Sequence, residues 1–101
     1  MAADHIRMAL GRIAEGAADP WPLVDEVVNA ALALGTPRGY DLYLVWTNFY
    51  DQTTESGGEQ AAKGAMPLAA TEWLESEGDD DAERAYLVKW FDYHGLRTQP
   101  G

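Results

Sequence analysis

Glycine and proline positions divide this chain into short segments, and they constrain its fold more than any other feature. Gly16, Gly35 and Gly78 each follow a segment with helical spacing, and glycine is common just after the last helical residue. Pro20 and Pro22 suit the first turn of a helix, where backbone N–H groups lack intrahelical partners. This punctuation predicts several short helices joined by short connections.

Apolar side chains recur at helical spacing between these stops. Ile6, Leu10 and Ile13 follow an i, i+4, i+7 pattern, and Asp4 is the expected N-cap of the first helix. A second helix is expected from about Asp19 to Gly35, followed by a loop over 35–39. The apolar stripe of this second helix comprises Val24, Val27, Val28 and Ala31.

Residues 40–50, YDLYLVWTNFY, fit two structures. Their β-branched and aromatic side chains favour a strand, whereas Leu42, Val45, Trp46 and Phe49 share one face of a helix. No other segment is typical of a strand, and a lone strand would leave its backbone groups unpaired. We therefore predict a helix, with a strand that pairs across a homodimer as the alternative.

The second half of the chain is expected to contain a flexible polar loop over 51–58 and two further helices. Pro67 is expected to interrupt the alanine-rich run and to begin a new helix that reaches Glu77. In the last helix, Asp80 and Glu83 have capping-box spacing, and the helix is expected to end near His94, before Gly95.

The chain of 101 residues is long enough for a single domain with one core. Its composition, 47% hydrophobic and 24% charged, is that of a globular protein. We predict an all-α fold, a compact bundle of about four to five short helices over residues 1–101; the strand alternative would make it α+β. The absence of cysteine and of a long apolar stretch favours a cytoplasmic protein.

An acidic run between Glu72 and Glu83 is the main clue to function. It contains seven carboxylates and no Lys, Arg or His, in a chain whose net charge is −10. Concentrated negative charge attracts basic partners. The members of the run are Glu72, Glu75, Glu77, Asp79, Asp80, Asp81 and Glu83.

The carboxylates of the run differ in how well helix formation explains them. The four from Asp79 to Glu83 favour the start of the last helix, because acids offset the positive end of its dipole. Glu75 and Glu77 stand at the opposite, negative end of the preceding helix, where acids are unfavourable. These two residues therefore favour a surface selected for negative charge, with a solvated polar face as the alternative.

Aromatic residues give a second clue. Tyr86, Trp90 and Tyr93 recur at i, i+4 and i+7, and Trp73 lies within the acidic run. They either fill the core or anchor a partner, since tyrosine and tryptophan are common at binding hot spots. The predicted partner-binding residues are Glu72, Trp73, Glu75, Glu77, Asp79, Asp80, Asp81, Tyr86, Trp90 and Tyr93.

Other kinds of site find little support in the sequence. Successive aspartates lack the alternating spacing of a calcium loop, so we expect no metal site, and no cofactor motif is present. No residues form an acid/base or nucleophile constellation, so no catalytic residue is predicted. The few scattered bases argue against direct nucleic-acid binding, and the negative charge argues against membrane binding.

The segment 77–81, followed by a helix with Lys89-Trp90 and then Gly95, resembles the tail of the small acidic immunity proteins that neutralise nuclease colicins. That family carries a tyrosine pair and a proline before its acidic run, where this chain has Trp73-Leu74-Glu75-Ser76. The resemblance implies a way in which acids and aromatics cover a basic enzyme surface.

Three functions follow from these observations. The leading hypothesis is a non-enzymatic protein that masks a basic protein surface, as an immunity protein, an antitoxin or a phage-type inhibitor that acts partly as a nucleic-acid mimic. The alternatives are a structural or assembly module that forms a homodimer and, third, a small enzyme or ligand-binding domain.

Overall fold

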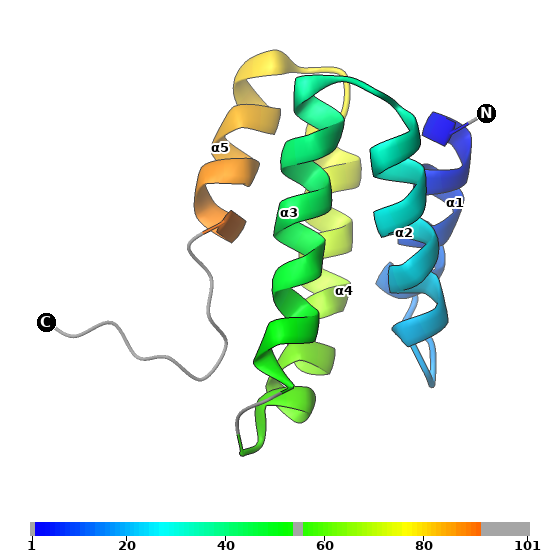
Figure 1. The fold of residues 1–101 in the computed structure, drawn as a ribbon, viewed down its shortest axis with the longest axis vertical. Helices are drawn as coiled ribbons and strands as arrows, with labels where there is room; N and C mark the ends of the chain where they lie inside the picture. The colour runs from blue at the N-terminus through cyan, green and yellow to red at the C-terminus, as the bar shows by residue number, and fades with distance from the viewer. Residues whose placement is uncertain (1, 54–55, 92–101) are drawn as a thin grey trace, which may run out of the picture.

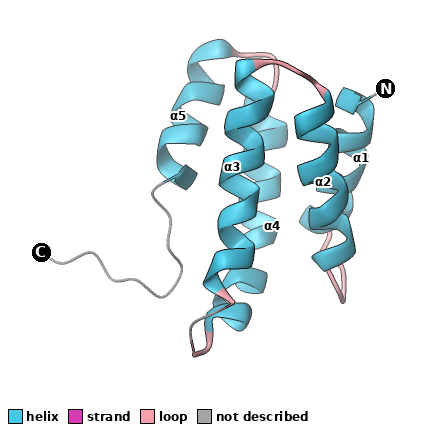
Figure 2. Ribbon diagram, in the orientation of Figure 1, coloured by secondary structure: helices cyan, strands magenta, loops and turns pink. Residues whose placement is uncertain are grey.

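A computed structural model describes residues 2–53 and 56–91 as helices joined by turns (Figures 1 and 2). The five helices are α1 (Ala2–Ala14), α2 (Trp21–Ala33), α3 (Pro37–Gln52), α4 (Gly58–Ser76) and α5 (Asp80–Phe91). No strand occurs within these described residues. The all-α prediction is confirmed, and the α+β alternative is not supported.

The first four helices form an antiparallel bundle. α1 packs against α2 and α4, and α3 packs against the same two helices, so these four close into a ring. Short connections make successive helices run in opposite directions (Figure 1). α5 lies outside the ring, against α3 and α4, on the side away from α1 and α2.

The aromatic segment 40–50 supplies the centre of the core as part of α3. Leu42, Val45, Trp46 and Phe49 are each at most 1% exposed. They share one helical face, which packs against neighbours on both sides because α3 contacts α2, α4 and α5. Burial within the chain's own core accounts for this segment without a second copy.

Glycine stops lie where the sequence predicts them. Gly16, Gly35 and Gly78 have φ angles of 91°, 66° and 92°, in the left-handed region that glycine adopts without strain. The expected loop over 35–39 is wrong in its second half, because α3 already begins at Pro37. Thr36 is its N-cap, with Oγ1 accepting a hydrogen bond from the backbone N–H of Gly39 at 3.0 Å.

The predicted restart at Pro67 is also wrong, since α4 continues through it. A proline inside a helix removes one backbone hydrogen bond and costs about 3 kcal/mol. The adjacent residues Met66, Ala69 and Ala70 are fully buried, and their packing offsets that cost. Helices α3 and α4 also reach into the expected loop 51–58, so the connection is limited to 53–57, of which 54–55 lie outside the described residues.

Two predicted helix starts need correction. α1 begins at Ala2, which places Asp4 in its first turn and not at the N-cap. For α5 the capping pattern is shifted by one residue from the predicted Asp80. Asp79 Oδ1 accepts from the Ala82 N–H at 3.1 Å, while Glu83 Oε2 accepts from the Gly78 N–H at 2.8 Å. The predicted end of the helix, near 94–95, lies outside the described residues.

Among the described residues, no helix has both the length and the apolar character that a membrane span requires.

Candidate functional site

The acidic run occupies the end of α4, the turn at 77–79 and the start of α5. Although no base is present within the run, the fold brings bases from α1, α3 and the end of α5 against it. Four of its seven carboxylates form ion pairs with these bases: Glu72, Glu77, Asp80 and Glu83. Much of the negative charge is therefore balanced by tertiary structure, which the linear sequence does not reveal.

Glu72 joins α4 to α5. Its two carboxylate oxygens accept hydrogen bonds from Lys89 Nζ at 2.9 and 2.8 Å, and Oε1 also accepts from Trp90 Nε1 at 2.9 Å. Burial favours a higher pKa for Glu72, but the hydrogen bonds from Lys89 and Trp90 outweigh it and leave the pKa below its ordinary value. Lys89 Nζ also lies 5.2 Å from the centre of the Trp90 ring.

Arg38 joins the start of α3 to the start of α5. Its guanidinium donates to Asp80 Oδ1 at 2.7 Å and to Glu83 Oε1. The hydrogen bond from Arg38 is the main cause that lowers the pKa of Asp80. Glu83 therefore has two structural functions, since one oxygen pairs with Arg38 and the other caps α5.

Glu77 has a specific partner in Arg7 of α1. Arg7 Nε donates to Glu77 Oε1 at 2.9 Å, and this hydrogen bond is the main cause that raises the pKa of Arg7. An acid at the end of α4 is unfavourable for the helix dipole, but here a cation lies beside it. The unusual position of Glu77 is thus accounted for within the fold.

Three carboxylates of the run have no ion pair in the part of the chain that the structure describes. Asp79 uses its side chain to cap α5, whereas Glu75 and Asp81 make neither a hydrogen bond nor an ion pair there. All three are exposed. They are the members of the run that remain available to a partner.

A shallow groove of about 340 Å³ separates α4 from α5 beside these acids. Glu72 and Lys89, which pair with each other, both line it, and so does Glu75, which has no ion pair among the described residues. Within the groove, Ala82, Ala85 and Tyr86 provide apolar surface, and Glu75 provides a carboxylate without an ion pair, which together suit a cationic side chain with an alkyl stem. Its lining residues are Glu72, Glu75, Ser76, Ala82, Ala85, Tyr86 and Lys89.

The predicted aromatic anchors lie in the core and not on the surface. Trp73, Tyr86 and Trp90 are 5%, 4% and 3% exposed. The Tyr86 ring lies 5.2 Å from that of Trp73 and 6.3 Å from that of Trp90, between centres, so α4 and α5 are joined by aromatic packing. These residues support the site from beneath. Tyr93 lies outside the described residues.

The sequence did not single out the apolar residues that α5 leaves exposed. Val88 is 69% exposed and Phe91 is 46% exposed. Helical spacing alone predicts one broad aromatic and apolar face on this segment. Which part of that face meets the core depends on how α5 is rotated against α3 and α4, and this rotation is a tertiary property.

The remaining bases are also engaged, apart from one. Lys63 pairs with Glu59, and Arg84 pairs with Asp80 at 3.1 Å. Among the lysines and arginines that the structure describes, Arg12 alone has no carboxylate within ion-pair distance. The described part of the surface therefore presents several acids without an ion pair, such as Glu75 and Asp81, and Arg12 as its one lysine or arginine without an ion pair.

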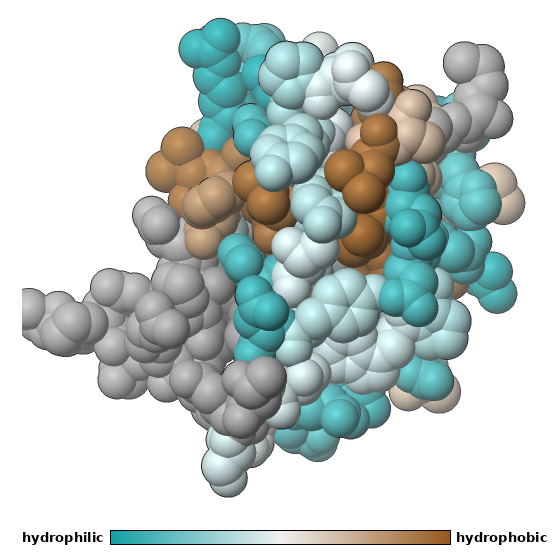
Figure 3. Space-filling view, viewed as in Figure 1, coloured by the Kyte–Doolittle hydropathy of each residue, from teal (hydrophilic) through white to brown (hydrophobic). Residues whose placement is uncertain are grey.

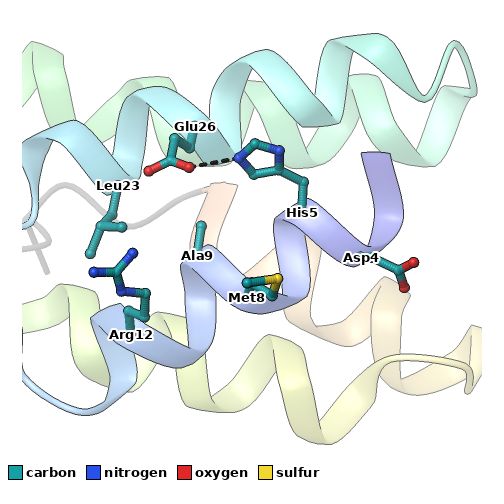
Figure 4. A pocket seen from close by; sticks show the side chains of 7 residues that line it. All are labelled: Asp4, His5, Met8, Ala9, Arg12, Leu23 and Glu26. Carbon is teal, nitrogen blue, oxygen red and sulfur yellow. Dashed lines mark hydrogen bonds and ion pairs between the residues drawn. The ribbon is translucent and has the colours of Figure 1, made fainter. Parts of the chain in front are cut away.

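Arg12 borders a second hollow of about 340 Å³, between α1 and α2 (Figure 4). There His5 Nε2 lies 2.6 Å from Glu26 Oε1, across the two helices. Ala9 and Leu23 give the hollow an apolar floor. Its charged groups are of both signs, and no cluster of three or more potential metal ligands occurs among residues 2–53 and 56–91.

Comparisons with protein-family models, curated proteins and solved structures found no match to this chain. The fold and the groups that it leaves exposed are therefore the basis for a proposed function.

Proposed function

We propose that this protein is a non-enzymatic binding protein that masks a basic surface of another protein. The observation that supports this most is the distribution of charge. Ion pairs within the fold engage all the described lysines and arginines except Arg12, while Glu75 and Asp81 are exposed without a partner. A basic surface would meet strong attraction and little repulsion.

In this proposal the acidic residues have two different functions. Glu72, Glu77, Asp80 and Glu83 hold α1, α3, α4 and α5 together. Glu75 and Asp81, together with the overall charge of −10, attract the partner and orient its approach. Trp73, Tyr86 and Trp90 act as packing beneath the surface. This arrangement is compatible with the immunity proteins, antitoxins and phage-type inhibitors that block basic enzymes.

Affinity capture from the native host, at low and at high salt, tests the proposal. The protein should retain a basic partner at low ionic strength and release most of it near 0.5 M salt, because exposed charges are screened over a few ångströms there. Retention that is indifferent to salt would contradict the electrostatic mechanism.

Charge reversal identifies the surface involved. The double variant Glu75→Lys and Asp81→Lys should weaken binding of the captured partner by roughly tenfold, equivalent to about 1.4 kcal/mol. A matched control with Glu15→Lys, Asn29→Lys and Gln60→Lys changes the net charge equally at exposed positions elsewhere. Equal loss in both variants would mean that only net charge matters and that the acidic run is not the contact surface.

A further inference from the structure

An apolar groove separates α5 from α3 on a face that the acidic run borders. It has a volume of about 350 Å³ and is lined by Asp41, Leu87, Val88 and Phe91. Hydrophobic side chains gather over α5 and at its border with α3, with hydrophilic ones around them (Figure 3). Val88 is 69% exposed and Phe91 is 46% exposed, so the described residues leave this apolar surface uncovered.

Among the described residues, the unpaired charge around this groove is negative. Asp41 borders it on α3, is exposed and has no ion-pair partner among the described residues. Asp81 precedes Val88 by seven residues, two helical turns, and so lies on the same face of α5. Arg84 lies between them, but its charge is balanced by Asp80 of the same helix.

We propose that the α3–α5 groove binds an amphipathic helix of the basic partner. Apolar side chains at i, i+3 or i+4, and i+7 of that helix cover Val88 and Phe91, and its Lys or Arg residues meet Asp41 and Asp81. The stripe from Asp81 to Phe91 rises about 15 Å, so an occupant of about three turns spans it. This inference rests on the proposed function and identifies the partner element that the protein recognises.

Charge distinguishes this occupant from a second copy of the chain. Two copies, each of charge −10, would bring the carboxylates that border the groove toward each other, and like charges oppose association. A cationic helix would instead place positive side chains beside these carboxylates, which attract it. The groove is apolar at its centre, with Asp41 on its α3 side and Asp81 two turns away along α5, and these features match the two faces of a basic amphipathic helix.

The probe is a synthetic peptide of leucine and lysine with leucines at helical spacing, titrated into the labelled protein and followed by backbone NMR shifts. A peptide of equal composition and charge, but scrambled spacing, is its control. We expect shifts concentrated at residues 41–48 and 84–91, and a Kd at least tenfold lower than that of the scrambled peptide. Equal affinities, or shifts centred elsewhere, would overturn the proposal.

Two variants make the site assignment specific. Val88→Ser with Phe91→Ser should weaken peptide binding at least tenfold, while the control, Met8→Ser with Leu68→Ser, should leave it unchanged. The control positions are 69% and 53% exposed, on α1 and α4. Circular dichroism confirms that both variants are folded. If light scattering instead shows that the wild type and the control variant are dimers and that the Val88/Phe91 variant is a monomer, the occupant is a second copy and the proposal is wrong.

The outcomes separate this inference from the proposed function. If capture of the native partner is sensitive to salt but is not weakened in the Val88/Phe91 variant, the groove is not the binding site, and the proposed function still holds. The opposite outcome is that the protein prefers the peptide with helical leucine spacing, while salt and substitution of Glu75 and Asp81 do not change capture of the native partner. That outcome would refute the electrostatic function and leave the groove as an apolar docking site.

Discussion

The hydroxyl of Tyr86 is buried without a hydrogen bond, and its removal tests the packing of α5 directly. Trp46 Nε1 and Trp73 Nε1 are likewise buried and unpaired. Burial is the main cause that raises the pKa of Tyr86, and the nearby Trp46 indole opposes it, although no hydrogen bond of acceptable geometry joins the two groups. Burying an unsatisfied polar group costs about 1–3 kcal/mol.

Tyr86→Phe keeps the ring and its aromatic contacts but removes this cost. Part of the gain is offset by the space that the oxygen leaves, so we expect the free energy of unfolding to rise by about 1 kcal/mol. For a chain of this length that corresponds to an increase in Tm of roughly 4–8 °C.

Urea unfolding followed by circular dichroism measures the change, with an m-value equal to that of the wild type as evidence that the same surface is exposed. Tyr50→Phe is the matched control. The Tyr50 hydroxyl donates to Asp25 Oδ1, so this variant should lose about 1 kcal/mol. If Tyr86→Phe also destabilises the protein by more than about 0.5 kcal/mol, the hydroxyl has a partner in solution, such as an internal water, and the reasoning fails.

Further predictions concern helix contacts and pH. Gly39→Ala should lower the free energy of unfolding by about 1–3 kcal/mol, because its Cβ would lie 2.6 Å from the Ala31 carbonyl oxygen. Gly64→Ala, whose Cβ would meet nothing within 4 Å, should raise the free energy of unfolding by about 0.5–1 kcal/mol. Urea unfolding of both variants tests this, and equal effects would contradict it. Arg38→Met should destabilise the protein by about 1 kcal/mol, because it removes the ion-pair partner of the mostly buried Glu83 carboxylate. Thermal unfolding at low and high salt measures this change. An unchanged Tm would mean that the ion pair contributes nothing to stability. The folded-state pKa of Glu72 is below its ordinary value of 4.5, so its contribution to stability is present above that pH and is lost as the pH falls through the lower, folded-state value. The free energy of unfolding of Glu72→Gln should therefore fall less steeply than that of the wild type between about pH 5 and pH 3. Parallel plots of the free energy of unfolding against pH would exclude this contribution.

Local signals were sufficient for the fold class and for the ends of α1, α2 and α4. Helices end at Gly16, Gly35 and Gly78, which have positive φ, and residues 40–50 bury one apolar face. Both features depend on residues within one or two helical turns of each other, so their spacing in the sequence predicts them. Pro67 predicts a helix restart because its cost is local, whereas the compensating burial of its neighbours depends on tertiary packing of α4 against α1 and α3.

The candidate site was predictable only in part, because its charges are balanced by distant residues. Glu77 pairs with Arg7, which is 70 positions away, and Asp80 pairs with Arg38, which is 42 positions away. No spacing rule reveals such pairs. The same limit applies to the aromatics, since the spacing of Tyr86 and Trp90 indicated a common face but not that it would turn inward.

The placement of α5 outside the ring has a consequence for how the molecule opens. Among the described residues α5 contacts only α3 and α4, so we expect its amide hydrogens to exchange at a lower free energy than those of the four-helix ring. Its departure would uncover the indoles of Trp46 and Trp73 and release the Arg38 and Glu72 ion pairs together. The rings of Tyr86 and Trp90 on α5 thus cover aromatic side chains of α3 and α4, which opening of this helix would expose to solvent.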